Sequence, residues 1–310
     1  MRNFKTLTIA ALALLSNASF AQNTITIKAS KAVKPLVESW AKAYNNAHPD
    51  VQVVFVKNNE SADLSYVSSR QDDYSVAYVG RYALLPVTSN NNPLLSDLNK
   101  RSWGKGDIKK LYFADAEEAY DEEDSEANEG KAGRLRKQLN VYSSSSSNSY
   151  SATFAQFFGF SAGEIRGNKI AGDDLFLLSA INRDQASITF NSIANIFDTN
   201  TRAIKQNIAL LPLNLRKETN VVLESGNLDE LLAILETASS DLIPVEEFGF
   251  AYDTHNTLAQ AFLAWVVSEG QNYNHANGFL QLTEKEATIQ LATIKGNNAT
   301  NAITTDIARR

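Results

Sequence analysis

Segments with the patterns of strands and helices alternate along this chain. Residues 24–28 alternate apolar and polar side chains, as a strand does, and residues 33–44 place apolar side chains at helical spacing. A His-Pro-Asp sequence at 48–50 ends the helix, and residues 51–56 have a second, mostly apolar strand pattern. Because strands joined by helices are typical of a parallel sheet covered by helices, the sequence predicts an α/β fold.

The same two periodicities recur through the rest of the chain. A Thr-Glu-Lys-Glu sequence at 283–286 is a capping-box pattern, which predicts the start of a last helix. Alternating or apolar runs predict strands at 75–79, 82–87, 139–142, 185–190, 208–213 and 245–252. Helical spacing predicts helices at 151–158, 228–235 and 258–269.

The first 21 residues have the pattern of an export signal. Arg2 and Lys5 precede an apolar run at 7–15, and a Ser-Phe-Ala sequence at 19–21 matches the small-x-small cleavage signature. The apolar run is too short to span a bilayer, and no later stretch approaches twenty apolar residues. We therefore expect residues 1–21 to be a signal peptide and the mature protein to be periplasmic, without a membrane anchor.

Composition excludes several classes of function. The chain has no cysteine, so disulfides, thiol catalysis and thiolate metal sites cannot occur. Its formal net charge of −6 argues against general nucleic-acid binding, which needs basic surfaces. None of the three histidines has the spacing of zinc ligands, and no nucleophile elbow, phosphate loop or dinucleotide fingerprint is present. We expect a protein without catalytic residues, metal or cofactor.

One acidic segment, residues 115–130, interrupts the alternating pattern. Nine of its sixteen residues are Asp or Glu, so it cannot pack into a core. We interpret it as a solvated, mobile insertion. A cation-binding loop is the alternative, although the acidic spacing does not match an EF-hand.

Two predicted helices begin with hydroxyl side chains directly after a strand. Ser30 precedes the first helix, and Ser151, Ala152 and Thr153 open another after a serine-rich run. Free backbone N–H groups at such helix starts, with a hydroxyl beside them, can bind an anion. Ser and Thr are also the ordinary amino caps of helices that bind nothing. Both interpretations remain open for each position.

The order of these motifs resembles the periplasmic phosphate-binding protein family, the PstS-like solute-binding proteins of ABC transporters. The opening "ITIKASKAVKPLVESWAKAYNNAHPDVQVVF" is similar to that family's first strand, Gly-Ser loop and helix. "ADLSYVSSR", "SATFAQFFGF" and "ASITFNSI" resemble later family segments, and "FLAWVVSEGQNYNHANGFLQL" is the most specific match. The resemblance implies a two-lobed type II periplasmic-binding-protein fold, in which each lobe is a mainly parallel sheet flanked by helices and hinge strands join the lobes. Lobe 1 would comprise residues 22–90 and 212–310, and lobe 2 residues 91–211.

The resemblance also implies a set of ligand-binding residues in the cleft between the lobes. Carried over position by position, these are Ser30, Lys31, Ser69, Arg70, Ser151, Ala152 and Thr153. The chain departs from the family at Phe154, where a polar or basic residue is usual, and at Ser147, where many members carry an arginine. The family's glycine-rich second loop is also missing. Arg70 or Arg81 could compensate for the lost arginine.

We accordingly expect a monomeric, exported protein that binds inorganic phosphate or another small oxyanion and delivers it to the membrane subunits of an ABC transporter. Asp63 could accept the proton of hydrogen phosphate, but Asp before a strand is also a common turn former, and we favour the turn. One alternative function is a receptor-like fold without a small ligand that serves as an envelope or secreted adaptor. Another is binding of a different solute, such as a sugar or a peptide.

Overall fold

The computed structural model describes residues 23–57, 59–68, 75–114, 133–146 and 149–296. The predicted signal peptide and the acidic segment therefore lie outside the described residues, as do the candidate ligand contacts Ser69 and Arg70.

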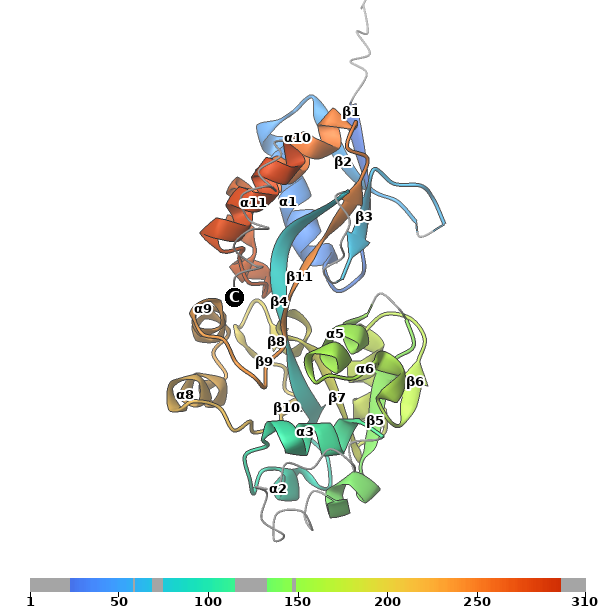
Figure 1. Cartoon of the computed structure of the whole chain (residues 1–310), viewed down its shortest axis with the longest axis vertical. Coiled ribbons are helices and arrows are strands. Elements are labelled where there is room, and N and C mark those ends of the chain that lie inside the picture. Colours follow the sequence, from blue (N-terminus) through green and yellow to red (C-terminus); the bar gives the residue numbers. More distant parts are fainter. Residues whose placement is uncertain (1–22, 58, 69–74, 115–132, 147–148, 297–310) are drawn as a thin grey trace, which may run out of the picture.

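Strand β1 (Asn23–Lys28) forms the centre of a parallel group at one end of the molecule. It pairs with β2 (Val51–Phe55), where Ile25 faces Val53, and with β3 (Leu64–Val67). Helix α1 (Lys34–Ala47) connects β1 to β2, and it buries the apolar stripe that its spacing predicts. With α10 (Thr257–Val267) and α11 (Glu284–Ile294), these strands and α1 form the upper group of elements in Figure 1.

A second parallel group lies at the other end. Strand β5 (Asn140–Ser144) pairs in parallel with β6 (Asn168–Ile170) and β7 (Ser187–Ser192). Several helices accompany these strands in the lower group of Figure 1. They are α2 (Leu95–Leu98), α3 (Lys105–Tyr112), α5 (Tyr150–Phe157) and α6 (Leu175–Arg183).

Two long strands connect the upper and lower groups. Strand β4 (Val76–Ser89) runs from one group to the other beside β11 (Val245–Tyr252), antiparallel to it. The sequence pattern had indicated separate strands at 75–79 and 82–87, and this was wrong. Gly80 and Arg81 remain extended because both pair with β11, at Phe248 and Glu247. The sheet is therefore continuous, in the order β2-β1-β3-β11-β4-β7-β5-β6, with β10 (Ile208–Leu210) paired to β4.

The remaining elements lie beside the lower part of β4. Strands β8 (Phe197–Asp198) and β9 (Ala203–Ile204) form a small separate ribbon, preceded by α7 (Ile193–Ile196). Helices α8 (Lys217–Ser225) and α9 (Leu228–Thr237) lie to the left of this ribbon, below α11 (Figure 1). The exact lobe boundaries remain a prediction. Among the described residues, no helix combines the length and the apolar character that crossing a membrane requires.

Candidate ligand-binding site

A cleft of about 620 Å³ opens where the upper and lower groups meet. Its upper wall is formed by the end of β1, the turn before α1, and parts of β2 and β3. The start of α5 and the turn before α6 form its lower wall. The cleft thus brings together segments from both ends of the molecule, as the sequence resemblance implies.

Lys31 and Asp173 connect the two walls of this cleft. The Lys31 backbone N–H donates to Asp173 Oδ2 across 3.1 Å. The Lys31 ammonium also lies over the ring of Phe176, 5.4 Å from its centroid. Asp173 Oδ1 accepts a second hydrogen bond, from the Leu175 amide at 3.0 Å. A single carboxylate therefore binds the first amide of α6 and the amide of Lys31, a residue that the resemblance assigns to the ligand site.

Asp174 makes the corresponding contact at the start of α5. The Tyr150 backbone N–H donates to Asp174 Oδ2 at 3.1 Å, and the Asp174 carbonyl accepts from Asn191 Nδ2 at 2.7 Å. The side chain is 8% exposed, and its second oxygen, Oδ1, has no hydrogen-bond partner among the described residues. A buried carboxylate oxygen without a partner costs free energy, so this atom would gain from a ligand that donates a hydrogen bond.

Burial dominates the electrostatics of Asp174. It raises the pKa of the carboxyl group to about 7, opposed by the hydrogen bond from the Tyr150 amide and assisted by the charge of Asp173. The phenol groups of Tyr66 and Tyr150 surround it, and desolvation raises the pKa of both. The Asp174 carboxyl group therefore has a pKa near neutral pH, and its neighbours include the neutral phenols of Tyr66 and Tyr150 as well as the charge of Asp173.

The predicted contacts of the first turn lie on the cleft wall. Ser30 and Lys31 both line the cleft, and the Ser30 side chain interacts with the Tyr66 phenol, which also lines it. Ser30 is not the amino cap of α1, because that helix begins at Lys34 with Val33 at the cap position. Lys28 and Lys34 line the same wall, so three lysines contribute to it.

The predicted ligand contacts Ser151, Ala152 and Thr153 make hydrogen bonds within the protein instead of lining the cleft. Ser151 and Thr153 are buried in the first turn of α5. Ser151 Oγ accepts from the Ser144 amide at 2.8 Å, and Thr153 Oγ1 shares a 2.7 Å hydrogen bond with the Tyr82 hydroxyl. Ala152 donates its amide to the Ser149 carbonyl at 3.3 Å. In this arrangement the cleft meets the helix start at Tyr150 rather than at residues 151–153.

Phe154 explains one departure from the family pattern. Its ring is fully buried and lies parallel to Phe190 with centroids 3.9 Å apart. The side chain at this position therefore belongs to the core of the lower group, where a charged residue would be costly.

Asp63 and Arg81 also have structural partners. The Asp63 carboxylate accepts from the Thr26 amide at 2.8 Å, the Thr26 hydroxyl at 2.6 Å and Asn256 Nδ2 at 2.9 Å. These are contacts to distant segments, not the local turn contact that the sequence favoured. Arg81 Nε donates to the Gln281 carbonyl at 2.8 Å and lies 3.7 Å from Glu286. It lines a different cavity, so it does not supply the missing cation here.

Sequence reasoning did not identify Asp173 and Asp174. Their position immediately before a helix was a signal for capping, but nothing in the sequence placed them opposite Lys31. Within the described ranges, no group of three or more His, Asp or Glu side chains could hold a metal ion.

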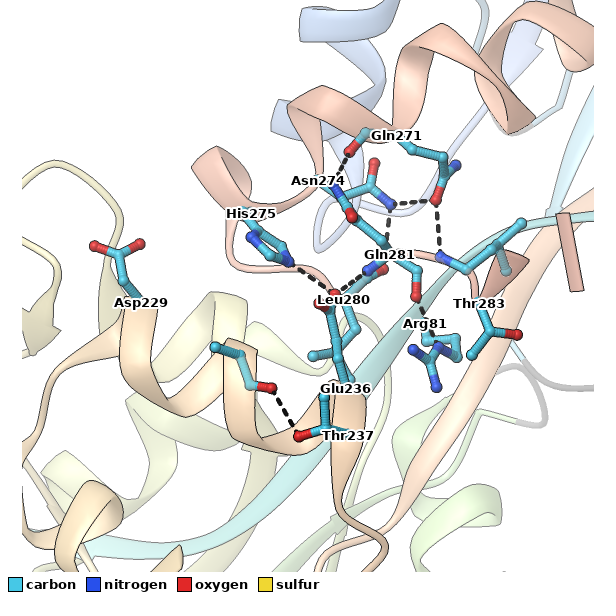
Figure 2. Close-up of polar contacts among 12 residues, drawn as sticks. Arg81, Asp229, Glu236, Thr237, Gln271, Asn274, His275, Leu280, Gln281 and Thr283 are labelled. Carbon is cyan, nitrogen blue, oxygen red and sulfur yellow. Dashed lines mark hydrogen bonds and ion pairs between the residues drawn. The ribbon is translucent and has the colours of Figure 1, made fainter. Parts of the chain in front are cut away.

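A second polar cluster lies away from the cleft. Glu236 Oε1 lies 2.7 Å from His275 Nε2 and accepts from the Gln281 amide at 2.6 Å (Figure 2). Gln281 in turn contacts Arg81, so the cluster joins α9 to the segment between α10 and α11 and to β4. These groups bond to one another, which indicates a structural connection.

Comparison with solved structures identifies the fold of this chain. No family model matches the chain, and no curated protein matches it. Among solved structures, a phosphate ABC transporter substrate-binding protein from Clostridium perfringens with bound phosphate is similar, with 16% identity, a TM-score of 0.54, and coverage of 84% of this chain and 100% of that one. An ABC-type phosphate transport receptor from Vibrio cholerae has 12% identity, a TM-score of 0.51, and coverage of 83% and 100%. The chain therefore has the two-lobed α/β fold of the type II periplasmic binding proteins.

Proposed function

We propose that this chain is an exported solute-binding protein that captures a small oxyanion, with phosphate as the preferred ligand, and delivers it to the membrane subunits of an ABC transporter. The main support is the pair of amides at Lys31 and Tyr150, on opposite walls of the cleft. Each donates to a carboxylate oxygen at 3.1 Å. Both positions therefore accommodate a negatively charged oxygen, which is what an oxyanion would present.

Asp174 favours phosphate over a fully ionised oxyanion. Hydrogen phosphate carries a proton at neutral pH and can donate it to the unpartnered Asp174 Oδ1, whereas sulfate has no proton to offer. Sulfate would leave this buried acceptor unpaired whenever Asp174 is ionised. Lys28 and Lys31, which line the cleft, offset part of the ligand's charge, whereas the Lys34 ammonium lies 3.6 Å from Glu38.

Titration calorimetry with phosphate and sulfate tests this function. We expect phosphate to bind at least tenfold more tightly than sulfate, and Asp174→Asn to reduce that preference. Asp97→Asn is the matched control, because the Asp97 side chain is 51% exposed, pairs with Lys100 and does not line the cleft. Absence of binding by any oxyanion below millimolar concentration, with the protein folded, would contradict the proposal.

A second candidate is a receptor-like fold that binds no small ligand and acts as an envelope or secreted adaptor. The observation that favours it is that Asp173 and Asp174 already satisfy the two cleft amides. It predicts no oxyanion binding in the calorimetry above and a protein partner that is retained whether or not phosphate is present.

A further inference from the structure

Asp173 is held in place by its own turn. Gly172, directly before it, has φ 108°, a conformation that side-chain-bearing residues rarely adopt. A Cβ at Gly172 would also lie 2.8 Å from the Phe176 ring, so the glycine allows this ring to cover the turn. With Oδ1 fixed by the Leu175 amide, the second oxygen of Asp173 is directed at the opposite wall.

Lys31 meets this turn with both its backbone and its side chain. Its amide bonds to Asp173, and its ammonium lies over Phe176, which is 42% exposed. These contacts join the segment before α1 to the segment before α6. They therefore connect the upper and lower groups directly, between residues that line the cleft.

We propose that Asp173 is an internal competitor for the anion, because its carboxylate binds the Lys31 amide that an oxyanion would use and holds the two walls together. This inference rests on the proposed function. An incoming oxyanion must displace the carboxylate and then lies beside a negative charge. Asp173 thus lowers affinity, and it keeps the cleft walls connected while no anion is bound.

The Asp173→Ser variant should keep the contact of this side chain with the Leu175 amide and remove its contact with the Lys31 amide. A serine hydroxyl can still accept from the Leu175 amide, the first amide of α6, but it is too short to reach Lys31. Removing a hydrogen bond to a charged group changes an equilibrium by roughly tenfold or more. We expect Asp173→Ser to bind inorganic phosphate about tenfold more tightly than the wild type in calorimetry. Asp97→Ser, which removes one exposed carboxylate on α2, should bind like the wild type.

A measurement without ligand tests the same contact independently. Amide hydrogen exchange at Lys31 should be about tenfold faster in Asp173→Ser than in the wild type, while exchange within α1 stays unchanged. Unchanged exchange at Lys31 would overturn the inference, as would wild-type or weaker phosphate affinity in a variant that binds phosphate. If neither protein binds any oxyanion but exchange at Lys31 rises, the connection between the walls is supported and the proposed function fails.

Discussion

Glu236 and His275 lie 2.7 Å apart and connect helix α9 to the segment between α10 and α11 (Figure 2). The hydrogen bond to Glu236 raises the pKa of His275, with burial opposing it. Burial alone would raise the pKa of Glu236, but the bonds from His275 and the Gln281 amide lower it overall. The pair is therefore favoured as a carboxylate beside an imidazolium.

We expect His275→Asn to destabilise the protein more at pH 5.5 than at pH 8.5. A raised histidine pKa gives stability that is present below the unfolded value of 6.5 and lost as pH rises through the folded value. The lowered pKa of Glu236 gives stability that is present above 4.5 and lost as pH falls through its folded value. Because the His275 side chain is 37% exposed, the loss at pH 5.5 should be about 0.5–1 kcal/mol.

Thermal unfolding at the two pH values measures this difference. His255→Asn is the control, since His255 also lies beside a carboxylate, 3.1 Å from Asp253 Oδ1, but both side chains are largely exposed, so its replacement should cost little. Equal destabilisation of His275→Asn at both pH values would contradict an ionic contribution from the pair.

Asp174→Asn should stabilise the protein above neutral pH. A pKa raised from 3.8 to about 7 means that the folded state keeps the proton while the unfolded chain loses it, so wild-type stability falls as pH rises through this window. The charges and hydroxyls facing the group are those of Asp173, Tyr66, Tyr82 and Tyr150. The asparagine cannot ionise, and its carbonyl can still accept from the Tyr150 amide.

Urea unfolding at pH 4 and pH 8 tests this expectation. The variant should resemble the wild type at pH 4 and exceed its stability at pH 8, by an amount between about 1 and 4 kcal/mol. Asp97→Asn retains Asp174, so its stability should follow that of the wild type in both conditions. A variant that is less stable than the wild type at pH 8 would show that the Asp174 charge is favourable in the folded protein.

Phe154→Ala should strongly destabilise the lower group. The ring is fully buried and stacks on Phe190. It also stacks on Phe113 and meets the Tyr112 ring edge to face. Truncating a buried phenylalanine costs about 3–5 kcal/mol. The neighbouring Phe157 is only partly buried, so Phe157→Ala should cost less in the same urea titration. Similar losses for the two variants would indicate that the aromatic stack contributes little.

Much of the fold could be predicted from periodicity, because burial of one face imposes it directly on the sequence. The apolar stripe through Leu36 and Trp40 predicted α1, and Thr283 predicted the start of α11 through its capping box, which the structure confirms. The continuity of β4 could not be predicted, since it depends on how Gly80 pairs with Phe248. For the same reason the contact of Lys31 with Asp173 has no local signal, because the two residues are brought together only by the complete chain.

The close approach of the two connecting strands makes Gly249 sensitive to any side chain. At this position β11 changes register against β4, and an added Cβ would lie 2.2 Å from the Ala77 carbonyl oxygen. Because that atom belongs to the backbone of a central strand, it cannot move aside cheaply. Gly249→Ala should therefore cost about 1–3 kcal/mol or more in urea unfolding. Gly133→Ala is the matched control, since an added Cβ there meets nothing within 4 Å and the residue is helical, so its stability should be unchanged or slightly higher. A Gly249→Ala protein as stable as the control would show that the strands can separate locally at no cost, and that this crossing does not fix how the upper and lower groups are joined.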